Sequence, residues 1–347
     1  MLDEIYLRLL MELTPDEHKP NRLDAERIIC GYGRTQESKD AYGKLLRTIY
    51  EADSASDIGM HYGRLLQPYA LCDFSRALMT APTFRDSLQL INELHYMQGA
   101  AYHLTMYQTA GTLSVALTYP YKKNVSDSQR RFCSEAVFTY LLNLARACVD
   151  SDAVPTRIWL DFEEPAYSGD YLEEYSCEPD FKAPIALLEF SSELGSRELN
   201  TSNHTLYKTY IKKCQDAARA AERYWSYDYR TSTLLMRHMP EAFSGEKLST
   251  LLNISPRGLQ KKLSNLDTSF SGLSSLARIE QTKVLLLQQQ KTIDATAELL
   301  GFQTTSGFRR FFKSEFGLSV NTFLNQVEQL AKNPEKIPSP RKQLQTS

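Results

Sequence analysis

A pattern that occurs twice in the last third of the 347-residue chain limits the possible folds most. The segments LSTLLNISPRGLQKKLSNL (248–266) and ATAELLGFQTTSGFRRFFK (295–313) follow one plan. Each begins as a short helix ending in two leucines, followed by Asn253 or Gly301, residue types that tolerate the left-handed backbone ending many helices. Each then continues with an apolar residue and a second helix. Each segment therefore predicts two short helices joined by a tight turn.

The second helix of each unit begins with a good N-cap and has two unlike faces. Ser255, which Pro256 follows, is the predicted cap of the first, and Thr304 or Thr305 is the predicted cap of the second. Leucines or phenylalanines recur at i, i+4 and predict a buried side: Leu259 with Leu263, and Phe308 with Phe312, followed by Phe316. The opposite faces carry Arg257, Gln260 and Lys261 in the first unit, and Ser306, Arg309, Arg310 and Lys313 in the second. The rings of the second unit are thus core residues that hold a helix with an outward basic face.

Two such units predict an all-α domain with two helix-turn-helix motifs. Between them, residues 270–290 read as one long helix. About 20 helical residues span roughly 30 Å, and one turn of B-DNA is about 34 Å. This spacing predicts that both second helices enter successive major grooves on one face of DNA.

Charge along the chain supports a nucleic-acid module at its end. From Arg230 onward there are 16 Lys and Arg against 9 Asp and Glu, whereas the preceding residues carry 24 against 33. A basic segment on an acidic body is typical of proteins that bind a polyanion through one domain. Solvated surface charge is the alternative interpretation of this difference.

The first 225 residues predict a mixed α/β domain of the size of a sensor domain. Ser126–Val149 has apolar residues at four-residue steps, which indicates a helix with one buried stripe. Thr112–Pro120 and Thr156–Phe162 are predicted strands. We expect this domain to cover residues 1–225 and to begin with an amphipathic helix over the first 13 residues. A DNA-binding domain over 230–330 and a disordered tail over 331–347 follow.

Other classes of site find no support in the sequence. The six cysteines are scattered without CxxC pairs, which favours reduced core thiols of a cytoplasmic protein. No apolar run is long enough to span a membrane. No phosphate-loop, zincin or hydrolase motif occurs, and no cofactor or metal is expected.

The segment from about Arg237 to Val327 resembles the DNA-binding domain of the AraC/XylS family of bacterial transcription regulators. The residues that carry this resemblance are ISPRGLQKKL, Ser269-Phe270, Arg278, Ile293, Ala297, LGF at 300–302, SGFRRFFK and FGLS. The preceding residues resemble the arabinose-binding-like domain of a branch of that family, in DIGMHYG, APTFRDSL, PTRIWLDFEEPAYSGDYLEEY and FKAPIALLEFSSELGSRELN. The chain departs from the family pattern at Gly258, Asp267, Thr282, Val320 and Leu324.

The resemblance implies a role for each exposed residue of the second helices. Arg257, Gln260 and Lys261 would face bases in one groove, and Thr305, Ser306, Arg309 and Arg310 would enter the next. Lys262 and Lys313 would contact phosphates. For any one lysine, a solvated helix face is an equally good interpretation.

The resemblance also implies that residues 1–225 are a ligand-sensing and dimerisation domain with a small-molecule pocket. It further implies an activator role, a homodimer and contact with RNA polymerase. Tyr96, Tyr102, His103 and Tyr107 are candidate pocket residues, with plain core packing as the alternative. Two other hypotheses remain. One is a constitutive regulator with a degenerate sensor. The other is an enzyme domain fused to a DNA tether. Its only support in the sequence is the two acidic pairs Glu163-Glu164 and Glu173-Glu174.

Overall fold

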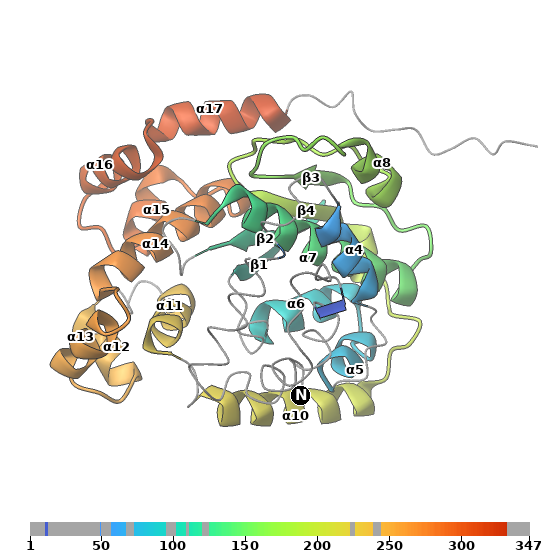
Figure 1. The fold of residues 1–347 in the computed structure, drawn as a ribbon, viewed down its shortest axis with the longest axis horizontal. Helices are drawn as coiled ribbons and strands as arrows, with labels where there is room; N and C mark the ends of the chain where they lie inside the picture. Colours follow the sequence, from blue (N-terminus) through green and yellow to red (C-terminus); the bar gives the residue numbers. More distant parts are fainter. Residues whose placement is uncertain are drawn as a thin grey trace, which may run out of the picture.

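A computed structural model of the protein describes residues 11–12, 49, 57–66, 73–94, 102–108, 111–119, 125–222, 226–238 and 244–331. Figure 1 shows the helices and strands along the chain. The N-terminal part contains α4 (Ile58–Leu65), α5 (Asp73–Met79), α6 (Phe84–Leu94), β1 (His103–Gln108), β2 (Thr112–Thr118), α7 (Asp127–Cys148), β3 (Arg157–Trp159), α8 (Gly169–Tyr175), β4 (Ala186–Ser191), α9 (Ser192–Ser196) and α10 (His204–Glu222).

The strands form one small antiparallel sheet in the order β1-β2-β4-β3. β2 and β3 are the two strands that the sequence predicts, and β1 and β4 join them. Val115 of β2 lies opposite Met106 on one side and Leu188 on the other, which sets the register of the three strands. The predicted mixed fold of the N-terminal domain is confirmed.

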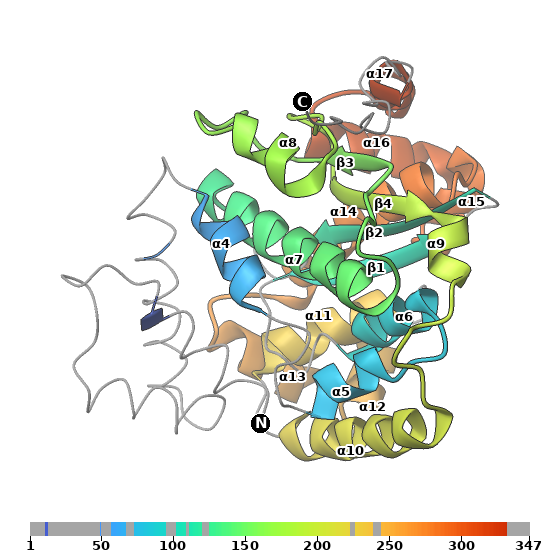
Figure 2. The same ribbon diagram turned by 90° about the vertical axis from the view of Figure 1, so that its right-hand side faces the viewer.

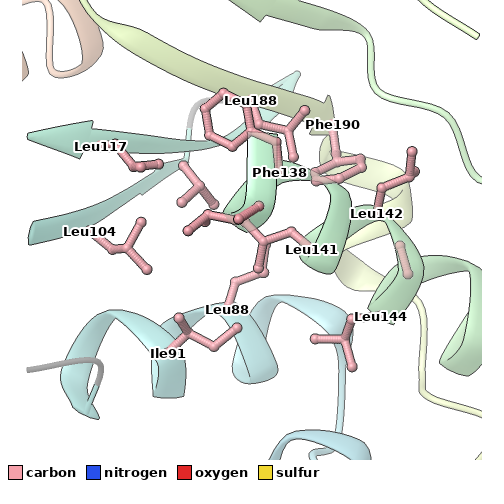
Figure 3. Close-up of a cluster of buried hydrophobic side chains, with 14 of the residues drawn as sticks. Leu88, Ile91, Leu104, Leu117, Phe138, Leu141, Leu142, Leu144, Leu188 and Phe190 are labelled. Atoms are coloured by element: carbon pink, nitrogen blue, oxygen red, sulfur yellow. The ribbon is translucent and has the colours of Figure 1, made fainter. Parts of the chain in front are cut away.

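The inner face of the sheet packs on α7 and α6 and forms the main hydrophobic core (Figure 3). Leu104, Leu117 and Leu188 point from the strands toward Phe138 and Leu141 of α7. The helix predicted over Ser126–Val149 is therefore present, but its burial is wider than the predicted single stripe. The sheet lies on one side of α7, and α4 packs along another. A helix in contact with several elements must bury more than one stripe.

The outer face of the sheet is also buried, and the C-terminal part of the chain packs against it. Side chains alternate along a strand, so Ala116, Trp159 and Leu187 face away from the main core and form a separate cluster with Ala183 and Ile185. Leu287, from the C-terminal region, packs on this cluster. In Figures 1 and 2, α14 and α15 lie beside the strands on this side.

Every described element of secondary structure in the C-terminal region is a helix, as predicted. It contains α11 (Tyr227–Arg237), α12 (Gly245–Leu251), α13 (Pro256–Ser264), α14 (Phe270–Lys283), the π-helix η4 (Val284–Gln288), α15 (Ile293–Leu299), α16 (Thr305–Phe316) and α17 (Val320–Ala331). Its described residues form two hydrophobic clusters. The buried members of the first lie within residues 235–277, and those of the second lie within residues 285–323. Each helix-turn-helix unit thus has a core of its own.

The connection between the two units differs from the single α-helix that the sequence predicts. From Val284 the helix widens, since the Gln289 amide donates to the Val284 carbonyl five residues back, at 3.0 Å. Leu285 and Leu286 are buried in the second C-terminal cluster, while the next leucine also reaches the sheet. The wide turn lets consecutive leucines serve two packing surfaces. Gln290, with φ of 48°, then ends the helix.

Three expectations concern the ends of the chain and the boundary between its parts. The predicted helix over the first 13 residues lies almost wholly outside the described residues, and so does most of the predicted tail over 331–347. The predicted boundary between the domains over 1–225 and 230–330 is in part helical, because α11 begins at Tyr227.

Candidate nucleic-acid interface

The first unit has the turn and cap that its sequence predicts. α12 ends at Leu251, and Asn253 has φ of 54°, the left-handed conformation that asparagine tolerates. The Ser255 hydroxyl accepts a hydrogen bond from the Gly258 amide at 3.1 Å, with Pro256 at the first helical position. Leu259 and its i+4 partner are buried, so α13 keeps its polar face outward.

The second unit repeats this geometry around aromatic residues. Gly301 has φ of 73°, and of the two candidate caps it is Thr304 whose hydroxyl accepts from Gly307, at 3.1 Å. Phe308 and Phe312 of α16 are fully buried. Phe316 stacks on Phe312 with ring centroids 4.2 Å apart. The prediction that these rings form a core under α16 is confirmed.

The sequence-predicted contact residues lie on the outer surfaces of α13 and α16. Eight of the nine are exposed: Arg257, Gln260, Lys261, Lys262, Ser306, Arg309, Arg310 and Lys313. The ninth, Thr305, is half-buried. Figure 1 shows α13 and α16 on the same side of the molecule, with α14 and α15 between them. α14 and the π-helix η4 that continues it connect the two units that carry these surfaces.

Two of these residues also contact side chains within the protein. Lys262 Nζ lies 4.3 Å from the centroid of the Tyr227 ring, so the end of α13 is held against α11. The Thr305 hydroxyl donates to Asp294 Oδ1 at 2.5 Å, which ties the start of α16 to the first turn of α15.

Arg278 has a structural role that the sequence does not assign. Its Nε donates to the Leu300 carbonyl at 3.0 Å, and its guanidinium lies 5.2 Å from the centroid of the Phe302 ring. Burial lowers the pKa of this guanidinium. It joins the connecting helix to the turn of the second unit. The sequence signal was its place among the residues that carry the family resemblance.

The departures from the family pattern are accommodated locally. Asp267 has φ of 52°, the left-handed conformation expected of a residue in place of glycine. Val320 is buried in the second C-terminal cluster, and α17 is formed. Glycine at position 258 avoids a tight contact, because a Cβ there would lie 3.1 Å from the oxygen of the capping Ser255.

The candidate pocket residues of the N-terminal domain are not brought together as one group. Tyr96 lies outside the described residues. Tyr102 packs against the main core, whereas His103 and Tyr107 share the outer face of β1 by strand alternation. His103 is buried and Tyr107 is half-buried.

A charged cluster lies where the two domains meet. Asp161 lies two residues after the end of β3, and its side chain is 10% exposed. Burial raises its pKa to about 6, although the positive charges of Lys283 and Arg130 oppose this rise. Arg130 Nε is 3.9 Å from an Asp161 oxygen, and Lys283 Nζ is 3.3 Å from Glu280. Lys283 and Glu280 belong to α14, so charges of the C-terminal region shift the pKa of the Asp161 carboxyl.

Within the described ranges, no three or more His, Cys, Asp or Glu side chains are grouped to hold a metal ion. In the same part of the chain, every helix is too short or too polar to cross a bilayer. The four cysteines that the structure describes there are free and buried: Cys133, Cys148, Cys177 and Cys214. This agrees with the interpretation of these cysteines as core thiols.

Two family models match separate parts of the chain. Residues 34–199 match the arabinose-binding domain of AraC transcription regulators, and residues 248–326 match a helix-turn-helix domain. The two ranges contain the sheet with its helices and the paired units, respectively. The predicted resemblance is confirmed in both halves.

Known proteins similar to this chain are regulators. The Ornithine utilization regulator of Pseudomonas aeruginosa is 21% identical over 260 residues, 75% of this chain and 76% of that protein. The Porin thermoregulatory protein EnvY of Escherichia coli is 34% identical over 82 residues, 24% of this chain and 32% of that protein. The HTH-type transcriptional activator CsvR of Escherichia coli is 27% identical over 78 residues, 22% of this chain and 29% of that protein. The enzyme hypothesis is thus not supported.

Among solved structures, the transcriptional regulator CdpR from Pseudomonas aeruginosa is similar to this chain. The similarity covers 92% of this chain and 98% of CdpR, with 18% identity and a TM-score of 0.47.

Proposed function

Since the chain belongs to the AraC family of transcription regulators, we propose that it binds promoter DNA with α13 and α16 in two successive major grooves. The observation that supports this most is the matched geometry of the two units. Each has a left-handed turn residue, a hydroxyl cap and a second helix with a buried apolar face and an exposed polar face. Helices placed in this way contact base edges through their N-terminal residues.

In the proposed complex the exposed side chains divide into base readers and phosphate contacts. The base readers are Arg257, Gln260 and Lys261 in one groove and Thr305, Ser306, Arg309 and Arg310 in the other. Lys262 and Lys313 contact phosphates, which add affinity without sequence information. An arginine pairs best with guanine and a glutamine with adenine, because both contacts are bidentate.

We expect Arg310→Ala to relax specificity at one base pair, by about 1–3 kcal/mol, while Lys313→Ala weakens binding to all sequences alike. The measurement is the affinity of the full chain for its selected site and for single-base variants, at several salt concentrations. The lysine variant serves as the matched control on the same helix, and its salt slope should fall by about 1. An equal loss on specific and random DNA for Arg310→Ala would remove it from the base readers.

We further propose that a small molecule bound to the N-terminal domain gates DNA binding. The protein would act as a dimeric activator that contacts RNA polymerase. CsvR is by its name an activator, and the Ornithine utilization regulator is named for the use of a small metabolite. The contact of Leu287 with the outer face of the sheet offers a route between the two domains. A ligand shifts such an equilibrium only if it binds one arrangement better than the other.

This gating predicts that a change on the sheet alters DNA binding at a distance. Trp159→Ala removes a large part of the cluster that Leu287 packs on, and it leaves α13 and α16 unchanged. We expect it to free the basic region from the acidic body and to raise DNA affinity about 5-fold or more, within the usual range of coupling free energies. Val154→Ala, at an exposed apolar position outside the cluster, is the control. Unchanged affinity in a folded Trp159→Ala protein would argue against coupling through this contact.

A further inference from the structure

An acidic side chain from α15 lies beside the start of α16. It is unexpected there, because the surrounding surface is basic. Asp294, in the first turn of α15, accepts a hydrogen bond from the Thr305 hydroxyl, with 2.5 Å between the two oxygens. Thr305 is the first residue of α16, and Asp294 is exposed. Arg309 and Arg310 follow one turn later. One carboxylate therefore lies beside the proposed base readers of the second unit.

This hydrogen bond determines which way the threonine hydroxyl can act. A free hydroxyl rotates and either donates or accepts, whereas an ionised carboxylate only accepts. The Thr305 proton must therefore point toward Asp294. The remaining lone pairs of the Thr305 oxygen, and the second oxygen of Asp294, are acceptors. The pair offers no donor to a neighbouring base.

We propose that Asp294 is a positioning residue that makes Thr305 an acceptor-only reader of one base pair. In the major groove, amino donors are presented by adenine N6 and cytosine N4, while guanine and thymine present acceptors there. The base that the Thr305 oxygen contacts is therefore an adenine or a cytosine, which fixes the strand on which the amino group of that base pair lies. This inference rests on the proposed function, because it requires the N-terminus of α16 to enter the major groove.

The two units differ at this point, so they do not read DNA in the same way. The residue in α13 that corresponds to Thr305 is Pro256, which has neither a hydroxyl nor an amide proton. The second unit also has Arg309 and Arg310, which only donate. The Ser306 hydroxyl can rotate to donate or accept, whereas the Asp294–Thr305 pair gives this donor-rich helix an acceptor of fixed direction.

The test compares variants of the full chain on the DNA site selected by the unaltered protein. Every base pair is changed in turn, and affinity is measured for each change. The unaltered protein should prefer one base pair at one position by about 5-fold or more, as expected for a hydrogen bond to a base. Asp294→Ala and Thr305→Val should reduce this preference to less than about 2-fold at that position alone, and Thr305→Ser should retain it.

Glu298→Ala is the matched control, because it removes the same charge from the same helix one turn further on, at an exposed position. It should change affinity for all sequences alike. An unchanged preference in Asp294→Ala or a loss spread evenly over all positions would overturn the inference while leaving the proposed function in place. An unaltered protein that selects no sequence would overturn both.

Discussion

Phe312→Ala should unfold the second helix-turn-helix unit and abolish sequence-specific DNA binding. Phe312 is fully buried and contacts three other rings, those of Phe308, Phe316 and Phe323, at centroid distances of 6.0, 4.2 and 5.4 Å. A buried phenylalanine truncated to alanine typically costs about 3–5 kcal/mol. The cluster around it is small, so other contacts cannot offset a loss of this size.

The measurement is chemical denaturation of the full chain, together with DNA affinity. We expect the C-terminal transition to move to lower denaturant and the main core of the N-terminal domain to unfold where it did before, because the two clusters share no residues. Phe311→Ala is the control on the same helix, at a half-buried position, and should cost clearly less. A Phe312→Ala protein with normal affinity and stability would mean that the ring cluster does not hold α16.

The C-terminal domain was predictable because its signals are local. Asn253, Gly301, Ser255 and the i, i+4 apolar pairs each act within a few residues, and turn, cap and buried face all followed from them. Only the choice between Thr304 and its neighbour as the cap stayed open. A hydroxyl at either position satisfies the same local rule, and only the final geometry distinguishes the two.

The features that the sequence did not reveal depend on contacts between distant segments. Trp159 and Leu287 are 128 positions apart, and no local pattern indicates that the outer face of the sheet is covered. The wide turn at Val284 lies next to Leu287, which packs on this second surface. The Asp294–Thr305 hydrogen bond joins two helices across a turn. An acidic residue in the first turn of a helix usually indicates only a favourable interaction with the helix dipole, so the sequence did not reveal this bond.

Glu135 is the clearest case of a residue that periodicity misplaces, since a charged side chain on a long helix is ordinarily exposed. In α7 it is 1% exposed, and its Oε1 accepts from the hydroxyls of Tyr167 and Tyr171 at 2.7 and 2.5 Å. Within the described part of the chain its Oε2 has no hydrogen-bond partner. The α4 backbone closes the site, because a Cβ at Gly59 would lie 2.4 Å from Oε2.

Burial raises the pKa of Glu135 to about 7, although the two tyrosine hydrogen bonds and Arg131 lower it in part. The folded protein then holds a proton that the unfolded chain releases above about pH 4.5. Stability contributed by this group is greatest at acidic pH and falls as pH rises from about 4.5 to 7. The upper limit of this loss is about 3 kcal/mol, at 1.36 kcal/mol for each unit of pKa.

Glu135→Gln should remove this loss and make the protein more stable above pH 8, by about 1–3 kcal/mol. Glutamine is neutral at every pH, and its carbonyl oxygen still accepts from both tyrosines. The measurement is the free energy of unfolding of both proteins from pH 5 to 8.5. Asp161→Asn is the matched control, because the pKa of Asp161 is raised only to about 6 and its own effect ends near that pH. Between pH 6 and 7, therefore, only the glutamine variant should flatten the stability curve. If both proteins lose stability in parallel over that interval, Glu135 is already ionised in the folded state, and solvent or another group must reach the site beside Gly59.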